Sequence, residues 1–381
     1  MGLITYSKLD RDFDGGIYLS PLGKVPPLDR IESVTSSPQP SGPSDWRPIP
    51  PAEIIGNETQ KLAVLHAIER AGLLVPDTRE PLAELLQKLQ RQNIRVVVAN
   101  ATPIEPSLNT PLAILHCMGE QVFAGLAILI NWLGADRAVM AYPHHFAIDR
   151  EIADKWRVCP LPVSDKYPQA RPASILRTLR KQGHLSRFVS RTSRPHLPPV
   201  QARRLRYPER SAVVFDMQLL RQVERLILAN SLPTERIVTV SGDGVARPSH
   251  FIAPVGLPLK QLLERASIYD DAQCVIDGSS LAGVAVDPDK TVIGFVSQSF
   301  TVVRYLSRPA AQPCIRCGWC IDDCPAGLNP IRLLRLCEKG KSELAVRNGL
   351  HKCVECGICS YICPSHLPIM NAIRMMKRKE L

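Results

Sequence analysis

Eight cysteines near the C-terminus fall into two runs with the same spacing. In each run three cysteines are separated by two residues, and a fourth follows after three more residues, directly before a proline; the runs are Cys314, Cys317, Cys320 and Cys324, then Cys353, Cys356, Cys359 and Cys363. This spacing is typical of proteins with two [4Fe-4S] clusters, in which the cysteine before proline ligates the other cluster. The sequence therefore predicts two ligand sets: Cys314, Cys317, Cys320 and Cys363 for one cluster, and Cys353, Cys356, Cys359 and Cys324 for the other.

Two other chemistries also use paired cysteines. Four-cysteine zinc sites contain similar pairs, but they do not need three closely spaced cysteines and a Cys-Pro, repeated twice. Disulfides form in oxidising compartments, and the chain opens with Met-Gly-Leu-Ile-Thr, without the basic and apolar pattern of a secretion signal. We therefore expect a cytoplasmic protein with reduced thiols and iron-sulfur clusters.

The remaining four cysteines stand outside the two runs. Cys337 shares an apolar helical pattern with Leu333, which is typical of a buried structural thiol, so we exclude it as a ligand. Cys117, Cys159 and Cys274 lie singly among apolar residues and are expected in hydrophobic cores.

Basic side chains near the cysteines are candidates for tuning the clusters. A cluster held by four thiolates is negatively charged, and nearby cations raise its reduction potential. The candidates by sequence position are Arg316, Lys352, His351 and His366.

Size and charge limit the classes of function. The chain has 381 residues, 45% of them hydrophobic, which is enough for two or three domains with cores of their own. Its longest apolar stretch, residues 122–133, is too short to cross a bilayer as a helix, so any membrane contact is expected to be peripheral. The net charge of +11 favours anionic partners.

Much of the positive charge is concentrated in residues 171–210, which contain eleven Lys or Arg and one acid, Glu209. A solvated loop is one interpretation, since prolines interrupt any periodicity. A docking surface for an acidic electron carrier is another, and anionic lipid headgroups would suit the same charge. Nucleic acid is less favoured, because no DNA- or RNA-binding motif accompanies the charge.

Composition and periodicity divide the chain into four parts. Residues 1–51 form an N-terminal segment with a linker that has six prolines between positions 38 and 51. Residues 52–232 alternate helical and strand patterns, which predicts an α/β domain with a parallel sheet and a basic insertion. Residues 233–300 read as a small β-grasp-like unit, and residues 301–381 as a helical domain around the two clusters.

Several elements are expected within these parts. Leu62, Leu65 and Ile68 lie on one stripe of a helix that begins at Glu58 and ends at Gly72. Further helices are expected at 81–89, 112–133, 219–226, 257–266, 330–339 and after Pro368, and strands at 94–100, 138–142, 212–215, 236–240 and 251–255.

Read in order, these pieces resemble the C subunit of the Rnf electron transport complex and, more distantly, the flavin-bearing, NADH-oxidising subunit of respiratory complex I. The residues that carry the resemblance are Gly15-Gly16-Ile17, Asn100-Ala101 with Glu105-Pro106, Lys166-Tyr167-Pro168-Gln169, Arg236 to Gly242, Gly244 to Pro248 and Arg316-Cys317-Gly318. The resemblance implies a multidomain α/β fold: a Rossmann-like flavin-domain scaffold, a β-grasp-like SLBB domain and an α-helical two-cluster ferredoxin-type domain.

The chain departs from that family where the family binds FMN. The family's glycine-rich phosphate loop corresponds to residues 69–79, which keep Gly72 alone, and its acidic motif keeps Asn100 and Glu105 but has Pro103 where the first acid would be. In such a loop the glycines lack side chains, so the backbone amides can approach a phosphate closely and bind it. These weakened features favour a chain without FMN, although Gly72, Asn100 and Glu105 would be its binding residues if the flavin were retained.

The resemblance and the cysteines together predict an iron-sulfur electron-transfer protein that relays electrons between redox partners. Ferredoxin, flavodoxin or membrane electron-transport subunits are the expected partners, within a hetero-complex in the cytoplasm or on the inner face of the cell membrane. One alternative is an FMN-dependent oxidoreductase of the same family that acts on NADH or a corrinoid. A second is a cluster-containing module for nucleic-acid binding or assembly, whose binding would weaken steeply with salt.

Overall fold

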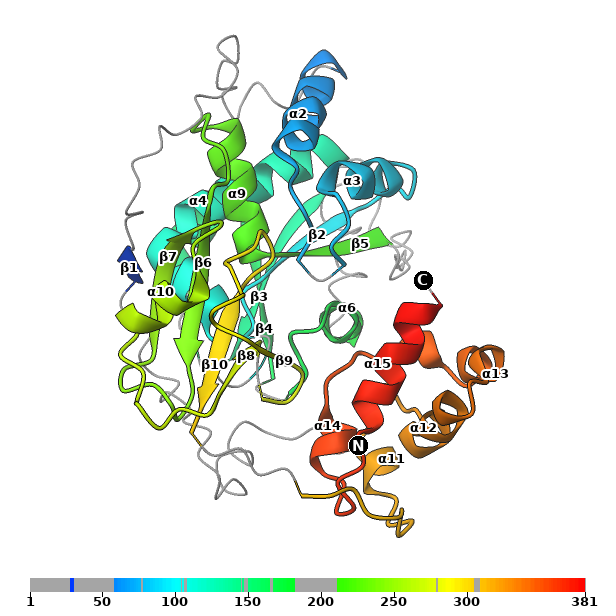
Figure 1. The fold of residues 1–381 in the computed structure, drawn as a ribbon. Helices are drawn as coiled ribbons and strands as arrows, with labels where there is room; N and C mark the ends of the chain where they lie inside the picture. The colour runs from blue at the N-terminus through cyan, green and yellow to red at the C-terminus, as the bar shows by residue number, and fades with distance from the viewer. Residues whose placement is uncertain are drawn as a thin grey trace, which may run out of the picture.

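The structure is a computed structural model. It describes residues 28–30, 58–181 and 211–380, except positions 77, 104, 106, 107, 145, 147–149, 165, 166, 279 and 305–308. The predicted proline-rich linker and most of the basic stretch therefore lie outside the described residues. Figure 1 shows an α/β body with a smaller helical unit beside it, in orange and red.

A four-stranded parallel sheet forms one half of the body. Its strands are β2 (Val96–Asn100), β3 (Arg137–Pro143), β4 (Val158–Val163) and β5 (Ala212–Asp216), in the order β4-β3-β2-β5. The predicted strands at 94–100, 138–142 and 212–215 are thus confirmed. Strand β4 was not predicted because Pro160 and Pro162 interrupt it, and prolines are tolerated there since β4 is an edge strand.

Helices cover both faces of this sheet, so its strands are apolar on both sides. One face packs against α2 (Glu58–Ala71), α3 (Leu82–Gln90), α4 (Thr110–Leu133) and α9 (Met217–Ile227). The other face packs against α6 (Pro172–Lys181), and the short helix α5 (Arg150–Lys155) precedes β4. Within β2, Val97 and Ala99 face the first core, while Val96 and Val98 face the second.

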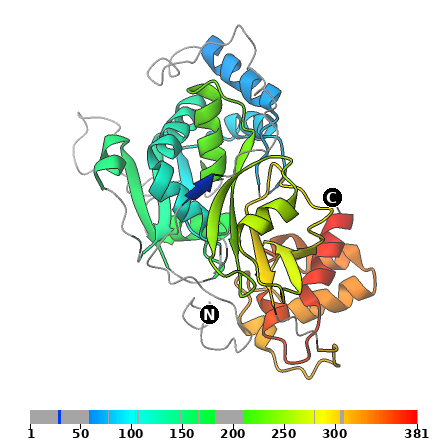
Figure 2. The same cartoon turned by 60° about the vertical axis from the view of Figure 1, so that its left-hand side comes forward.

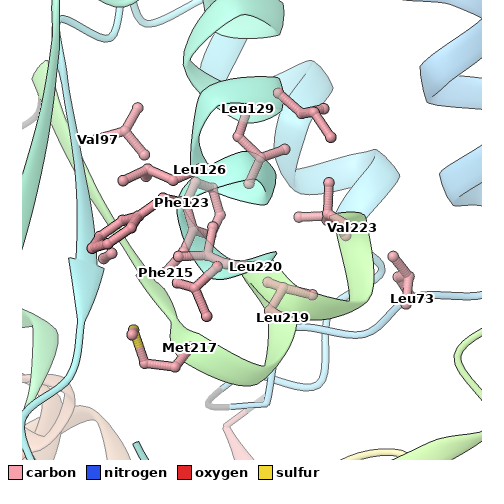
Figure 3. Close-up of a cluster of buried hydrophobic side chains, with 14 of the residues drawn as sticks. Leu73, Val97, Phe123, Leu126, Leu129, Phe215, Met217, Leu219, Leu220 and Val223 are labelled. Carbon is pink, nitrogen blue, oxygen red and sulfur yellow. The ribbon is translucent and has the colours of Figure 1, made fainter. Parts of the chain in front are cut away.

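Helix α4 is the central helix of the body. By length and composition alone it could cross a membrane, and it is the one such helix in the described part of the chain. Its apolar residues are largely buried, and Figure 3 shows Phe123, Leu126 and Leu129 facing Leu220 and Val223 of α9. Gly125 permits this packing, because a Cβ atom there would lie 1.9 Å from the carbonyl oxygen of Leu220.

Two expectations about side chains in these helices were wrong. Leu62, placed on the buried stripe of α2, is 52% exposed, and Val64 is buried instead. Cys117, expected in a core, is exposed on α4, while Cys159 and Cys274 are half-buried. For Leu62 and Cys117 the apolar pattern fits more than one helix face, and tertiary packing decides which face is covered.

A six-stranded mixed sheet forms the other half of the body. Its strands are β1 (Leu28–Arg30), β6 (Glu235–Ser241), β7 (Ser249–Pro254), β8 (Cys274–Asp277), β9 (Val284–Val286) and β10 (Ser299–Val303), in the order β1-β7-β6-β10-β8-β9. Strands β6 and β7 form the predicted hairpin, and α10 (Leu259–Arg265) packs on the sheet as expected. Strand β10 runs parallel to β6 and continues past residue 300, where we expected the domain to end.

The helical unit contains short helices around the cysteines. They are α11 (Trp319–Asp322), α12 (Pro330–Glu338), α13 (Ser342–Arg347), the 3-10 helix η3 (Leu350–Lys352), α14 (Ile358–Tyr361) and α15 (Ile369–Lys379). The predicted cap is confirmed, since the Asn329 side chain accepts a hydrogen bond from the Arg332 amide at 3.0 Å. Gly340 follows the end of α12 with a φ of 63°. Figure 2 shows this unit against the side of the body that carries β8 to β10.

Candidate metal centre

The first group of cysteines lines one pocket of the helical unit. Cys314, Cys317, Cys320 and Cys363 surround about 750 Å³ of space, together with Arg316 and Arg335. Burial raises the pKa of the Cys320 thiol, and its three partner cysteines raise that pKa further, while a backbone hydrogen bond from Ile331 opposes them. The four thiols of this first group are therefore within electrostatic range of one another. Cys317 is exposed to solvent.

The second group lines a separate and smaller pocket. Cys324, Cys353, Cys356 and Cys359 surround about 390 Å³. Burial, together with the neighbouring thiols of Cys353 and Cys324, raises the pKa of Cys356 to about 12 and places that of Cys359 well above the ordinary range. These thiols stay protonated at neutral pH unless a cation displaces their protons, as a coordinated metal does.

The backbone repeats itself between the two cysteine runs. Arg316 and Glu355, which precede the second cysteine of each run, both have positive φ angles of 60° and 52°. Gly318 and Gly357 follow with φ angles of 84° and 80°, and a short helix begins after each. The same local sequence thus builds the same loop twice.

Each predicted set of cysteines lines a pocket of its own. Among the residues that the structure describes, no three His, Cys, Asp or Glu side chains are close enough together to hold one metal ion. The thiols of each predicted set stand around one pocket, as ligands to different irons of a cluster would. The structure therefore brings together the members of each predicted set, and their ligation of iron stays a prediction.

The second group lies on the side of the helical unit that faces the body. The Tyr167 hydroxyl donates a hydrogen bond to the Cys356 carbonyl at 2.6 Å, and Arg374 donates to the carbonyl of Ala282 at 2.7 Å. Gly357 is pressed against the loop after β8, because a Cβ atom there would lie 2.0 Å from the Leu281 carbonyl oxygen. The second group is thus enclosed at a domain junction, whereas the first group has an exposed member.

Two cations that form hydrogen bonds beside the second group were not among those expected from sequence position. Lys377 donates to the Cys353 carbonyl at 3.1 Å and to Glu355 at 2.6 Å, and Arg374 donates to Glu355 at 3.1 Å. Both come from α15, which lies beyond the second cysteine run in the sequence. Of the expected candidates, Arg316 lines the first pocket, while His351, Lys352 and His366 are exposed.

A third pocket lies in the body at the carboxyl ends of β2 and β5. The chain leaves β2 toward β3 and β4 and later returns to β5 on the other side of β2, which makes this edge the point where parallel sheets of this type bind ligands. About 450 Å³ of space is lined here by Asn100, Thr110, Pro111, Ile114, Ala170, Arg171, Pro172, Asp216, Met217, Gln218 and Gln298. We call it the switch-point pocket.

The residues expected to hold FMN do not fit the flavin. The Asn100 side chain lines the switch-point pocket but donates to the Ala170 carbonyl at 2.9 Å and accepts from the Thr102 amide at 3.0 Å. Glu105 is 4% exposed, and its carboxylate lies 3.8 Å from the guanidinium of Arg171. Burial raises the pKa of Glu105 to about 7, and the charges of Arg171 and Arg374 oppose that shift.

Gly72 does not contribute to this pocket. It ends α2 with a φ of 63°, as a helix C-terminus requires. Amides of the loop that follows are already bonded: Leu73 donates to the Ile68 carbonyl of α2 at 3.5 Å, Val75 to that of Glu80 at 2.9 Å, and Arg79 to that of Val75 at 2.7 Å. Amides already bonded in this way cannot cradle a phosphate.

Known proteins resemble the chain in sequence and in fold. No model of a known protein family matches it. It is 26% identical over 309 residues to the C subunit of the ion-translocating oxidoreductase complex of Yersinia pestis, an alignment that covers 77% of this chain and 46% of that protein. The protein of the same name from Rhodobacter capsulatus is 23% identical over 353 residues, which covers 90% of this chain and 64% of that protein.

A solved structure supports the likeness of fold. A chain of a NAD⁺-reducing [NiFe]-hydrogenase in the air-oxidized state aligns with a TM-score of 0.53 and 18% identity, over 82% of this chain and 60% of that one. The chain spans from under half to just under two thirds of the length of these curated relatives. The resemblance expected from the sequence is confirmed: the chain is similar to the C subunit of ion-translocating oxidoreductase complexes and shares a mixed α/β fold with a chain of an NAD⁺-reducing hydrogenase.

Proposed function

We propose that the chain is an iron-sulfur electron-transfer subunit of an oxidoreductase complex and that it holds two [4Fe-4S] clusters. One observation carries the proposal: eight thiols line two separate pockets in one helical unit, four in each. The ligand sets proposed are Cys314, Cys317, Cys320 and Cys363, and Cys353, Cys356, Cys359 and Cys324. When bound, such clusters supply one-electron redox chemistry over a wide range of potentials.

The residues around the thiols have roles of their own. The amide of Leu328 donates a hydrogen bond to the Cys324 sulfur at 3.3 Å, which stabilises negative charge there. Lys377 and Arg374 add positive charge beside the second group, partly offset by Glu355. Exposure of Cys317 gives a redox partner close approach to the first group.

The body serves as a scaffold in this proposal. We assign β6 to β10 with α10 to the SLBB domain and the β2–β5 sheet to the Rossmann-like part, following the resemblance. The occupied loop amides at Val75 and Arg79 support a chain without FMN. A flavin-dependent NADH or corrinoid oxidoreductase is the second candidate, favoured by the switch-point pocket alone.

The partners proposed are redox proteins within a hetero-complex, such as ferredoxin, flavodoxin or membrane subunits. The relatives' name, which refers to an ion-translocating complex, supports a peripheral position at a membrane. The described part of the chain has one helix of spanning length, α4, and it packs in the core.

The test is a chemical analysis of the chain purified without oxygen. Iron, acid-labile sulfide and acid-released flavin are measured in one sample. The proposal predicts about eight irons and about eight sulfides per chain and no flavin. Stoichiometric FMN would favour the second candidate, and zinc or fewer than about four irons would contradict both.

A further inference from the structure

Arg171 lies where the body meets the second cysteine group. It lines the switch-point pocket, and its Nη2 atom lies 3.8 Å from the Glu105 carboxylate. It also hydrogen-bonds the Tyr167 side chain, whose hydroxyl donates to the Cys356 carbonyl at 2.6 Å. A continuous chain of polar contacts therefore runs from Glu105 through Arg171 and Tyr167 to the backbone of a proposed ligand.

The charge of Arg171 already acts on the second group. Burial raises the pKa of the Cys356 thiol, and the charge of Arg171 opposes that rise, which means that Arg171 favours negative charge at that position. A field that favours a thiolate also favours an additional electron at the same place. Because Cys356 and Tyr167 are buried, solvent screens this interaction only weakly.

Glu105 is placed to cancel that field. The groups that act on it are Arg171 and Arg374, while the phenol of Tyr167 senses its charge. Arg374 has a carboxylate partner of its own, Glu355, at 3.1 Å. Glu105 is thus a carboxylate paired with Arg171, on the body side of the junction.

We propose that Arg171 raises the reduction potential of the cluster held by Cys324, Cys353, Cys356 and Cys359, and that Glu105 is the proton-controlled counter-charge that makes this potential depend on pH. The inference rests on the proposed function and adds to it the two residues that regulate one of the two clusters. Neither residue is a ligand, so both act through charge on the group that Tyr167 contacts.

The coupling balances electrons and protons. When a reductant such as dithionite delivers one electron to the enclosed group, the junction gains one negative charge. The Glu105 carboxylate then takes one proton from water and becomes neutral, so the total charge of the junction is restored. Oxidation returns the electron to an acceptor and the proton to water.

The sign of the pH effect follows from the state of Glu105. Its pKa of about 7 means that it is ionised above neutral pH, where it cancels part of the positive charge of Arg171. Below that pH it is neutral, and the full charge of Arg171 acts on the enclosed group. The midpoint potential should therefore rise as pH falls through about 7, and should change little where Glu105 stays in one state.

The experiment is a potentiometric titration of the full chain loaded with iron and sulfide, followed by electron paramagnetic resonance at pH 6, 7 and 8. Arg171→Gln should lower one of the two midpoint potentials and leave the other unchanged. Arg171→Lys keeps the positive charge, so both midpoint potentials should stay close to the wild-type values. Glu105→Gln should hold that same midpoint at its low-pH value at every pH. Arg180→Gln removes an exposed charge from α6, the helix that begins directly after Arg171, and is the matched control.

Two results would overturn the inference. One is a pair of wild-type midpoint potentials that do not change with pH, together with an Arg171→Gln variant in which neither midpoint potential shifts. The other is a shift of the midpoint potential in Arg180→Gln as large as that in Arg171→Gln. An infrared titration of the chain without clusters checks the pair independently: the Glu105 carboxyl band should titrate near pH 7 and at higher pH in Arg171→Gln, and an unchanged titration would contradict the ion pair. Failure to bind iron would instead contradict the proposed function, while the infrared result would still decide the pairing.

Discussion

At the scale of single residues, the position of a cysteine in the repeated run matters more than its accessibility. Neither Cys317 nor Cys337 is fully buried in the helical unit, yet Cys317 lines the first pocket and Cys337 lies on α12 among apolar side chains. Spacing in the sequence distinguishes the two cysteines. Cys317 is one of three cysteines at intervals of three residues along one loop, whereas Cys337 belongs to neither run.

Replacing these two thiols gives different expected results. Cys317→Ala removes one ligand of the first group, so the iron content should fall from about eight to about four per chain, the content of one remaining cluster. Cys337→Ala should keep the full content. Iron and sulfide analysis of both variants, purified side by side without oxygen, measures this; equal iron loss in the two variants would contradict the proposed ligand set.

The residues that regulate the site were harder to predict than its ligands. The ligand spacing is local in the sequence, so it can be recognised without the fold. Arg171 and Tyr167 approach the second group from a distant part of the chain, and no spacing in the sequence links them to Cys356. The absence of a glycine-rich loop could be seen in the sequence, but the hydrogen bonds that occupy its amides could not.

At the scale of elements, the body depends on the close contact between α4 and α9. Most helices and strands of the body were predicted, since their apolar patterns have a clear period. The proline-interrupted β4 was missed, and β8, β9 and β10 were not predicted as strands. Strands β8 and β9 have only four and three residues, and β9 is largely exposed, so their pairing comes from the sheet and not from a strong local pattern.

Two glycines of α4 test the helix contact. Gly125→Ala places a methyl group 1.9 Å from the Leu220 carbonyl oxygen, which must push α9 away and should cost about 1–3 kcal/mol. Gly119→Ala meets nothing closer than 3.9 Å and should be neutral or stabilising by up to about 1 kcal/mol, because alanine favours helix. Thermal unfolding followed by circular dichroism compares the two; similar midpoints would refute the contact.

At the scale of the whole molecule, the helical unit is attached so that one cysteine group is enclosed and the other is open. Tyr167, Leu281 and Ala282 of the body all contact the side of the unit that carries the second group. This asymmetry was not visible in the sequence, where the two runs look equivalent. It gives the two proposed clusters different surroundings, and hence different expected potentials.

A matched pair of glycines tests this attachment. Gly318 and Gly357 occupy equivalent places in the two runs, with φ angles of 84° and 80°, so alanine is strained to a similar degree at both. Only at Gly357 would the new Cβ also meet the body, 2.0 Å from the Leu281 carbonyl oxygen; at Gly318 the nearest atom is 3.9 Å away. Gly357→Ala should therefore loosen the unit from the body.

The readout is the rate at which oxygen bleaches the cluster absorbance. The enclosed group should lose its protection in Gly357→Ala, so bleaching should be faster than in Gly318→Ala. Equal rates in the two variants would show that the body does not shield the second group.

The most direct test of the central claim is a spin count of the reduced chain. The full chain is purified without oxygen, reduced with dithionite, and its electron paramagnetic resonance signal is integrated against a standard. Two [4Fe-4S] clusters, each with one unpaired electron when reduced, predict about two spins per chain, with no flavin radical. A count near zero in the reduced, iron-analysed chain, or a flavin radical as the main signal, would contradict the account.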